Sequence, residues 1–314
     1  MTKYSNFIAI GQVFCYNRYN MANKRTKSFT LIEMLLVVVI IGILSSILLF
    51  NSQDAFDEEK KMKLLSSAES LKGRNPETLV SEWNFEGPTL AGLSATDNDV
   101  KDTWGYNNGK VTGAPIVKDG ESCISGKCLS FDGASSVSIP TNESFNVVSE
   151  ITFEGWFYVN NYATSYNGPL LGQWTTVRFW QYASSGMARC FVWEIYNDGT
   201  RRFYDIDLSL IPLNQWTYLN LIYTTDGYLK IYQNGKLFGS KSVGVIDIPL
   251  SSSDFFLGNT YYNGYLDQIR YYKKALSIAE IKQNYIAGLD SLLSKNLISE
   301  EEYDNKMINL ATNE

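Results

Sequence analysis

Acidic side chains and cysteines carry most of the reactive chemistry of this chain, because its 314 residues include no histidine. Catalytic sites of the Ser-His-Asp or Cys-His kind are therefore excluded, and so are metal sites with imidazole ligands. The net charge is -6, and no basic stripe is present that would neutralise phosphates, which argues against a nucleic-acid partner. Carboxylates, thiols and the abundant aromatic rings (21 Tyr and 7 Trp) remain as functional groups.

Two of the four cysteines stand close together, in the segment CISGKC. Cys123 and Cys128 flank a short loop around Gly126 that can close on itself. In an oxidising compartment we expect them to form a disulfide, and the alternative is a pair of free thiols. A zinc site is disfavoured because the sequence has no second pair of cysteines.

One carboxylate, Glu33, interrupts an apolar run over residues 31–50. A helix of this length, at about 1.5 Å per residue, spans about 30 Å, which is the thickness of a bilayer core. Basic residues precede the run and acidic residues follow it, which predicts a cytoplasmic N-terminus with the bulk of the chain outside. A carboxylate inside a membrane helix is costly and usually has a partner, although Glu33 of an ordinary signal anchor could also reach the interface.

The segment KSFTLIEMLLVVVIIGIL, which contains Glu33, resembles the N-terminal cleavage and methylation segment of type IV prepilins and pseudopilins. The resemblance implies that a prepilin peptidase cuts between Ser28 and Phe29 and that the new amine of Phe29 is methylated. It also implies that Glu33 pairs with the terminal amine of a neighbouring pilin subunit during assembly. Such an ion pair is worth more in a low-dielectric medium than in water. Ser28 stands where the family usually has Gly, and Ser is the next small residue.

Short alternating strands fill the region after about residue 80. The segments Ile151 to Val159, Arg189 to Tyr196 and Trp216 to Thr224 are rich in aromatic and β-branched residues. Asn234-Gly235, between two alternating runs, is a strong hairpin signal. Several such strands without helices between them predict a mainly β fold, an antiparallel sandwich.

The order of motifs after residue 82 resembles the concanavalin A-like, laminin G-like jelly roll. The motifs that carry the resemblance are WNFEG, DTWGYNNGKVTG, GKCLSFDGASSVSIP, ITFEGWFY, NQWTYLNLIY, LKIYQNG and GYLDQIRYYKKALSIAEI. The resemblance implies a short helix after the last strand, and Ser277 with Glu280 has the pattern of a capping box at its start.

The same resemblance implies a structural Ca²⁺ site where the first and last strands meet. Asp267, in GYLDQIRYY, matches the usual side-chain ligand of the family, and Glu86 and Asp132 lie in segments expected to be adjacent. Carboxylate and carbonyl oxygens are the ligands that calcium prefers. The alternative is that Asp267 only accepts backbone hydrogen bonds.

Aromatic side chains from successive segments could line a carbohydrate-binding face. Sugars present apolar C–H faces beside hydroxyl edges, and they bind to aromatic rings flanked by polar groups. The candidates are Trp174, Trp180, Tyr182, Trp193 and Tyr196, with Tyr261 and Tyr262 in a loop before the last strand. The alternative is that these rings pack the core, because half of each strand faces inward and the sequence does not fix which half.

We expect no enzymatic activity. Jelly-roll glycosidases place paired catalytic carboxylates close together on one strand, in an E-x-D-x-E-like run. Neither Glu194 with Asp198 nor Asp205 with Asp207 forms that pattern.

The end of the chain is predicted to form two short helices. Asn296 breaks the pattern between them, and Ser299 with Glu302 forms another capping box. The segment LLSKNLISEEEYDNKM resembles the short SHOCT-type helical hairpin, which implies oligomer contacts. The alternative is a tail that packs against the sandwich.

These features divide the chain into consecutive parts. We expect a leader over 1–28 (with Met21 as an alternative start), a transmembrane helix and stem over 29–72, a linker over 73–81, the jelly roll over 82–286 and a helical hairpin over 287–314. The sequence thus predicts a pilin-like protein, passing once through a bacterial cytoplasmic membrane, whose outer domain binds glycans or other surface ligands in adhesion. The rival prediction is a purely structural minor pilin or pseudopilin of a type IV pilus or a type II secretion-like system.

Overall fold

The computed structural model describes residues 30–46, 58–59, 61–62, 77–86, 99–113, 116–146, 149–164, 169–182 and 189–312. The chain divides into two units, one up to Asp54 and one from Ala55, and each is described by itself. In the first unit, residues 31–46 are helical and their side chains are exposed. Ser28, Phe29 and most of the predicted stem lie outside the described residues.

Within the described part of the chain, none of the helices combines the length and the apolar character that crossing a membrane requires.

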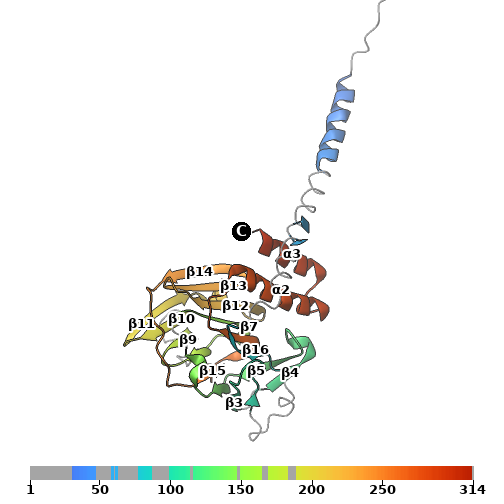
Figure 1. Cartoon of the computed structure of the whole chain (residues 1–314). Coiled ribbons are helices and arrows are strands. Elements are labelled where there is room, and N and C mark those ends of the chain that lie inside the picture. The colour runs from blue at the N-terminus through green and yellow to red at the C-terminus, as the bar shows by residue number, and fades with distance from the viewer. Residues whose placement is uncertain are drawn as a thin grey trace, which may run out of the picture. The chain divides into compact units, whose positions relative to one another are not determined.

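Two antiparallel sheets pack face to face in the second unit (Figure 1). Sheet A contains, in spatial order, β14 (Lys236–Ser242), β13 (Tyr228–Gln233), β12 (Trp216–Tyr223), β7 (Ile151–Asn161), β16 (Asn263–Tyr272), β5 (Lys127–Asp132) and β4 (Ile116–Asp119), and β1 (Leu79–Trp83) also pairs with β16. Sheet B contains β11 (Thr200–Ile206), β10 (Cys190–Asn197), β9 (Val177–Tyr182), β8 (Leu171–Gln173), β15 (Phe255–Leu257), β6 (Ser136–Ile139), β3 (Gly109–Thr112) and β2 (Asp99–Val100). The predicted antiparallel sandwich is confirmed.

Tight turns and short 3-10 helices join the strands. The predicted Asn234-Gly235 turn joins β13 to β14, and both residues have positive φ (51° and 77°), as a type I′ turn requires. Asp198-Gly199 joins β10 to β11 in the same way. The 3-10 helices are η2 (Gly120–Ser122), η3 (Glu143–Phe145) and η4 (Leu208–Leu210).

The main core lies between the two sheets, because alternate residues of each strand point inward. Phe153 of β7 meets Trp193 of β10 edge to face, with ring centroids 5.5 Å apart. Phe255 of β15 meets Phe153 in the same manner at 5.4 Å and stacks on Trp83 at 5.5 Å. The aromatic rings of the two sheets thus interlock at the centre of the sandwich.

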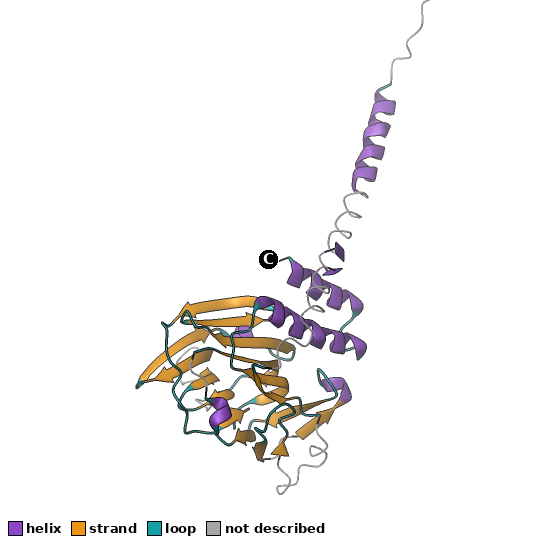
Figure 2. Ribbon diagram, in the orientation of Figure 1, coloured by secondary structure: helices purple, strands orange, loops and turns teal. Residues whose placement is uncertain are grey.

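Two helices cover the outer face of sheet A (Figure 2). The helix α2 (Ile278–Ser294) begins at the predicted capping box, in which Ser277 and Glu280 exchange side-chain and backbone hydrogen bonds. The helix α3 (Glu300–Ala311) begins at Ser299, whose side chain accepts a hydrogen bond from the backbone N–H of Glu302.

The predicted boundary at residue 286 falls inside α2, so the C-terminal hairpin continues the domain. A second hydrophobic core joins sheet A to both helices, and it includes Trp156, Tyr218, Tyr285, Leu289, Tyr303, Met307 and Leu310. The hairpin therefore packs against its own sandwich. The oligomer contacts implied by the SHOCT-like resemblance stay a prediction.

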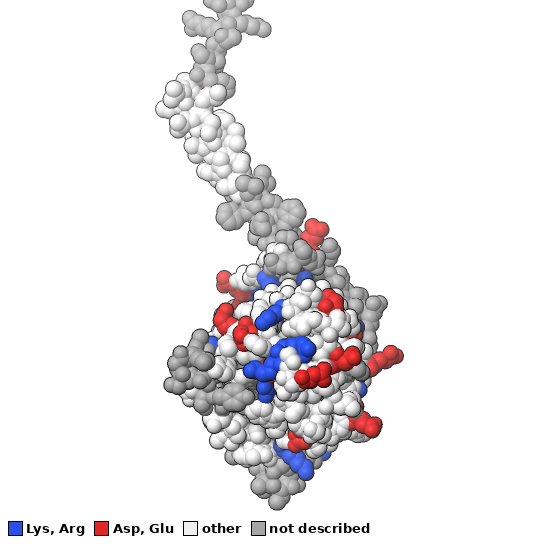
Figure 3. Space-filling view, turned by 90° about the vertical axis from the view of Figure 1, so that its left-hand side faces the viewer, with Lys and Arg blue, Asp and Glu red and all other residues white. Residues whose placement is uncertain are grey.

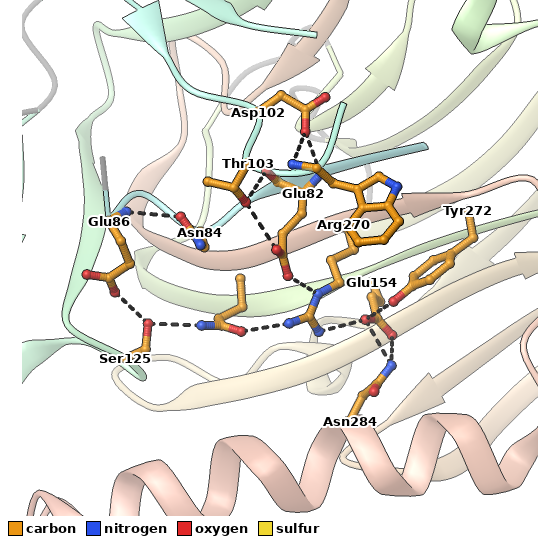
Figure 4. A network of polar contacts seen from close by, with 12 residues as sticks. Glu82, Asn84, Glu86, Asp102, Thr103, Ser125, Glu154, Arg270, Tyr272 and Asn284 are labelled. Atoms are coloured by element: carbon orange, nitrogen blue, oxygen red, sulfur yellow. Dashed lines mark hydrogen bonds and ion pairs between the residues drawn. The ribbon is translucent and has the colours of Figure 1, made fainter. Parts of the chain in front are cut away.

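A buried carboxylate lies at the boundary between sheet A and α2 (Figure 4). Glu154 of β7 is 0% exposed, and its Oε1 accepts hydrogen bonds from Arg270 (3.0 Å) and Tyr272 (2.9 Å). Its Oε2 accepts hydrogen bonds from Tyr218 (2.7 Å) and from Asn220 (3.0 Å).

Asn284 of α2 donates to both oxygens of Glu154, at 3.1 Å each. Burial, and then the charge of Glu154, raise the pKa of Tyr218 and of Tyr272, so both hydroxyls stay protonated and donate. Every donor that the charge needs is therefore supplied by the strands beside it and by the helix above it.

We expect the Glu154→Gln substitution to destabilise the domain by about 3–5 kcal/mol, because it breaks the ion pair of a fully buried carboxylate with Arg270 and weakens the acceptor of two buried tyrosine hydroxyls. Urea unfolding of the variant measures the loss. The matched control is Glu82→Gln, which breaks another ion pair of Arg270 (2.6 Å) whose side chains are 21% and 22% exposed. The control should cost less than about 1 kcal/mol. Equal losses in the two variants would contradict the central role of Glu154.

Candidate ligand-binding face

The outer face of sheet B presents the side chains that alternate with the core residues of β9 and β10. Phe179, Phe191 and Trp193 belong to the core between the sheets. Their neighbours Trp180 and Tyr182 lie on the opposite side, where their rings meet edge to face with centroids 5.7 Å apart. Strand register places Tyr196 opposite Arg201 on the same side.

Cations and aromatic rings alternate in a row across this outer face. The row runs Trp174, Arg178, Trp180, Arg201, Phe203, Lys241, and we call it the cation–aromatic row. The guanidinium carbon of Arg178 lies 5.2 Å from the ring centroids of both Trp174 and Trp180. That of Arg201 lies 5.6 Å from Trp180 and 5.2 Å from Phe203, and Lys241 Nζ lies 4.8 Å from Phe203. Each contact is within the range of a cation–π interaction.

Glu194 of β10 lies at the centre of this row and holds its two arginines. It stands opposite Arg178 on β9 and opposite Phe203 on β11. The carboxylate is 0% exposed, with Oε1 accepting from Arg178 Nε at 2.7 Å and Oε2 accepting from Arg201 Nη2 at 2.5 Å. Two ion pairs to one buried carboxylate fix the guanidinium groups, and these in turn fix the orientation of the aromatic rings.

Exposure differs along the row and decides which groups a ligand can touch. Trp174, in the turn between β8 and β9, is 39% exposed, and the side chain of Arg201 is 45% exposed. Trp180 is only 2% exposed, so its ring supports its neighbours and is not open to a ligand. Tyr182 and Tyr196 are half-buried. The accessible groups are therefore the indole of Trp174 at one end of the row and the guanidinium of Arg201 farther along it, with Tyr196 opposite Arg201.

Positive charge gathers at the end of the row, where the free edges of the two sheets, β11 and β14, lie. Figure 3 shows Lys and Arg side chains collected on this side of the molecule, with acidic side chains beside them. Arg201 and Lys241, which share the ring of Phe203, are both exposed.

Three of the predicted ligand-binding residues lie elsewhere. Trp193 is 0% exposed in the core and its indole N–H donates to the Ile222 carbonyl, so the prediction of a ligand contact is wrong for this residue. Tyr262 is 6% exposed and packs edge to face on Phe131 in the same core, which excludes it for the same reason. Tyr261 is exposed, in the turn between β15 and β16.

Asp267 of β16 is fully buried and only half satisfied. Its Oδ2 accepts a hydrogen bond from the backbone N–H of Ser125 at 3.0 Å, whereas its buried Oδ1 has no hydrogen-bond partner. Burial, together with the negative charge of Glu86, raises the pKa of Asp267 to about 7. An orphaned carboxylate oxygen near a second carboxylate fits a divalent cation with oxygen ligands.

The structure brings Glu86 to this site but not Asp132. Glu86 follows β1 and accepts hydrogen bonds from Ser125 Oγ (2.7 Å) and from the backbone N–H of Lys127 (2.9 Å). Asp132 pairs with Asn263, four positions before Asp267 on β16, and its carboxylate binds Ala134 N–H and Ser135 Oγ. Among the described residues, no group of three His, Cys, Asp or Glu side chains is arranged to hold a metal.

The predicted disulfide between Cys123 and Cys128 is confirmed. The loop that it closes carries Ser125 under the end of α2, where Lys295 Nζ donates to the Cys123 carbonyl at 3.2 Å. The loop therefore joins the Asp267 site to the helical layer.

In the first unit, Glu33 binds the start of its own helix. Its Oε2 accepts hydrogen bonds from the backbone N–H (2.9 Å) and the hydroxyl (3.0 Å) of Thr30, and Thr30 Oγ1 accepts from the backbone N–H of Glu33. This reciprocal pair has the geometry of a capping box, so the carboxylate has local partners before any assembly.

The sequence did not identify Arg178, Glu194, Arg201 and Phe203 as part of the site. A signal for the first of them was available, because Arg178, Trp180 and Tyr182 are spaced by two and must share one face of a strand. Arg201 and Phe203 meet the row only through the pairing of β10 with β11.

Two family models match separate parts of the chain. Residues 131–282 match the concanavalin A-like lectin/glucanases superfamily, and residues 23–49 match the prokaryotic N-terminal methylation motif. The chain thus joins a prepilin-type methylation motif to a concanavalin A-like, laminin G-type domain, as the sequence predicts. Among curated proteins, none matches this chain.

Several solved structures are similar in fold. The binding domain of Paraclostridial Mosquitocidal Protein 1 superposes with a TM-score of 0.54 at 19% identity, covering 68% of this chain and 53% of that one. The botulinum neurotoxin serotype D binding domain gives 0.52 at 14% identity, covering 69% and 53%. A serotype D ligand binding domain in complex with N-acetylneuraminic acid gives 0.51 at 14% identity, covering 69% and 52%. This chain spans about half the length of these chains, and the similarity concerns the fold.

Trp193 lies in the core and Trp174 lies at the outer face of sheet B, and substitution of each one tests this placement. We expect Trp193→Ala to destabilise the domain by about 3–5 kcal/mol, because it empties a large volume between the sheets. Trp174→Ala should change stability by less than about 1 kcal/mol, because the ring is partly exposed in a turn. Thermal or urea unfolding compares the two. A large loss from Trp174→Ala with none from Trp193→Ala would reverse the assignment.

Proposed function

We propose that this chain is a pilin-like surface protein whose concanavalin A-like domain binds carbohydrate. The observation that carries the proposal is the cation–aromatic row, in which the partly exposed indole of Trp174 contacts the guanidinium of Arg178 on the outer face of sheet B. A fixed, exposed indole offers an apolar plane to the C–H face of a sugar, and the neighbouring polar groups can bind its hydroxyls.

The charge of the row favours sugars that carry an acidic group. Glu194 compensates much of the charge of Arg178 and Arg201, whereas Lys241 continues the row at its exposed end. An anionic sugar that extends along the row from Trp174 would reach the exposed side chains of Arg201 and Lys241, and Glu194, the acidic member of the row, is buried. Acidic glycans are therefore expected to bind more tightly than neutral ones, and more weakly at high salt.

In this proposal, the N-terminal segment places the protein in a bacterial membrane or in a filament. The helix over residues 31–46 exposes a continuous apolar surface, from Leu31 to Leu44, that lipid or neighbouring helices would cover. In the proposed sequence of events, a prepilin peptidase cuts between Ser28 and Phe29 on the cytoplasmic side of a bacterial membrane. Glu33 then exchanges its Thr30 contacts for the terminal amine of a neighbouring pilin subunit. The domain is thereby displayed outside the cell in adhesion.

We also propose that a Ca²⁺ ion binds at Asp267 with help from Glu86. The unpartnered Oδ1 of Asp267 supports this, since a buried carboxylate without a counter-charge is costly. The ion would tie the end of β1 to β16 and would have a structural role.

The rival proposal is a structural minor pilin or pseudopilin. The methylation motif favours it, because that motif alone accounts for incorporation into a filament or a secretion complex. In that case the outer face of sheet B would be without a glycan ligand, and the jelly roll would only contact other subunits.

A glycan array with the full chain tests carbohydrate binding. The protein is kept in a detergent without a sugar headgroup, so that the detergent cannot occupy the site. We expect Trp174→Ala and Tyr196→Ala to weaken binding at least about tenfold, which corresponds to a loss of about 1.4 kcal/mol per ring.

The matched control for the array is Tyr106→Ala, which removes a ring that is 97% exposed and lies outside the row. Binding by this control should equal that of the unchanged protein. A blank array from a protein that unfolds cooperatively would overturn the lectin proposal and leave the structural one.

Calcium should raise the melting temperature of the domain by several degrees. Saturation 100-fold above Kd stabilises a folded protein by about 2.7 kcal/mol. Differential scanning calorimetry at pH 8, with calcium and then with EDTA, measures the shift. Asp267→Asn should abolish the shift without destabilising the metal-free domain, since it removes a buried charge.

Asp132→Asn is the control for the calcium experiment, because this carboxylate lies away from Asp267 and should leave the shift intact. A shift that persists in Asp267→Asn would show that calcium binds elsewhere.

A further inference from the structure

A pocket of about 380 Å³ lies between the outer face of sheet A and the C-terminal hairpin. Its volume falls in the range of about 300–1,000 Å³ that is typical of small-molecule sites. Its walls combine aromatic, aliphatic and polar side chains, with the sheet as floor and the turn between α2 and α3 as roof. No spacing in the sequence predicts this pocket, because β7 and β12 are distant from the hairpin along the chain.

Three aromatic rings form one wall of the pocket. Tyr158 of β7 meets Trp216 of β12 edge to face, with centroids 5.6 Å apart, and meets Tyr265 of β16 in the same way at 5.1 Å. All three are half-buried, unlike the fully covered rings of the core. The indole N–H of Trp216 donates to the Ser122 carbonyl at 3.1 Å, which fixes its plane. Edge-to-face contacts leave ring faces available to a ligand.

Polar groups stand at the rim beside these rings. Asn214 and Gln215 are exposed in the connection that leads into β12. The backbone there is held in place, because the N–H of Asn214 donates to the Val159 carbonyl at 2.9 Å. From α3, Glu302 and Lys306 form an ion pair at 3.2 Å and also line the pocket. The two amide side chains make the rim polar, and the Glu302–Lys306 ion pair adds no net charge to it.

The roof of the pocket is part of a well-packed layer. Leu297 and Ile298, in the turn after α2, line the pocket, while Tyr303, Met307 and Leu310 of α3 are buried in the second core. Lys61, near the stem, also pairs with Asp304 of α3 at 2.5 Å. The hairpin is therefore anchored on both sides of the turn that covers the cavity.

We propose that this pocket is a second carbohydrate site, specific for a short neutral oligosaccharide. Ring faces of Tyr158, Trp216 and Tyr265 would stack on the C–H faces of the sugar, and the amides of Asn214 and Gln215 would bind its hydroxyls. An anionic ligand would find no uncompensated cation, because Lys306 is paired with Glu302. The site lies on the sheet opposite to the cation–aromatic row and does not depend on it.

The test uses the full chain carrying Trp174→Ala, which removes the proposed contact on sheet B and leaves the pocket unchanged. Neutral trisaccharides of glucose, of N-acetylglucosamine and of xylose serve as probes in saturation-transfer NMR and titration calorimetry, in a detergent without a sugar headgroup. We expect at least one probe to bind. Leu297→Trp, which fills the cavity from the roof, and Tyr265→Ala, which removes a central ring, should each weaken that binding at least tenfold.

Val245→Trp is the matched control, because it introduces the same indole ring at a position that is 76% exposed and outside the pocket. Its binding should equal that of the parent, and thermal melts confirm that each variant is folded. Failure of all probes to bind would overturn the proposal, and so would binding that survives Leu297→Trp. If Leu297→Trp abolishes probe binding, the pocket proposal is supported even when Trp174→Ala leaves binding on the glycan array unchanged. The two proposals can therefore fail separately.

Discussion

The buried charge of Glu154 is the constraint around which the outer layer of the domain is organised. An isolated carboxylate in such a place would cost several kcal/mol, so the fold must bring donors to it from every side. Arg270 and Tyr218 come from the flanking strands, and Asn284 comes from α2. The helix therefore has one favoured position on the sheet. Sliding it by a turn would remove Asn284 from both carboxylate oxygens, a penalty that apolar contacts alone would not impose.

That fixed position of α2 has two consequences at its C-terminal end. Its C-terminal end reaches the disulfide loop, where Ser125 contacts both Asp267 and Glu86. The turn that follows places Leu297 over the aromatic wall of the pocket. The buried ion network, the proposed cation site and the cavity are thus parts of one layer. Sheet B, by contrast, organises its outer face around Glu194, so each sheet carries one buried acid with arginine partners.

Local signals in the sequence predicted much of the fold. Asn234-Gly235, the capping box of Ser277 and Glu280, and the pairing of Cys123 with Cys128 depend on residues a few positions apart, and all three are confirmed. The candidate site was predicted less well. Trp180 and Trp193 sit on strands buried on both faces, so alternation alone could not tell which ring points outward. The partners of Glu154 are up to 130 positions away, beyond the reach of any spacing rule.

The edge strands β14 and β11 affect whether copies of this protein pair edge to edge. At the high local concentration that the proposed membrane or filament location implies, bare strand edges promote sheet-to-sheet pairing and aggregation. β14 carries Lys236 and Lys241, and its pairing with β13 is interrupted by a bulge. β11, an edge strand of sheet B, carries Arg201 and Arg202. Like charges on β14 and β11 therefore disfavour pairing of these two edge strands with a second copy.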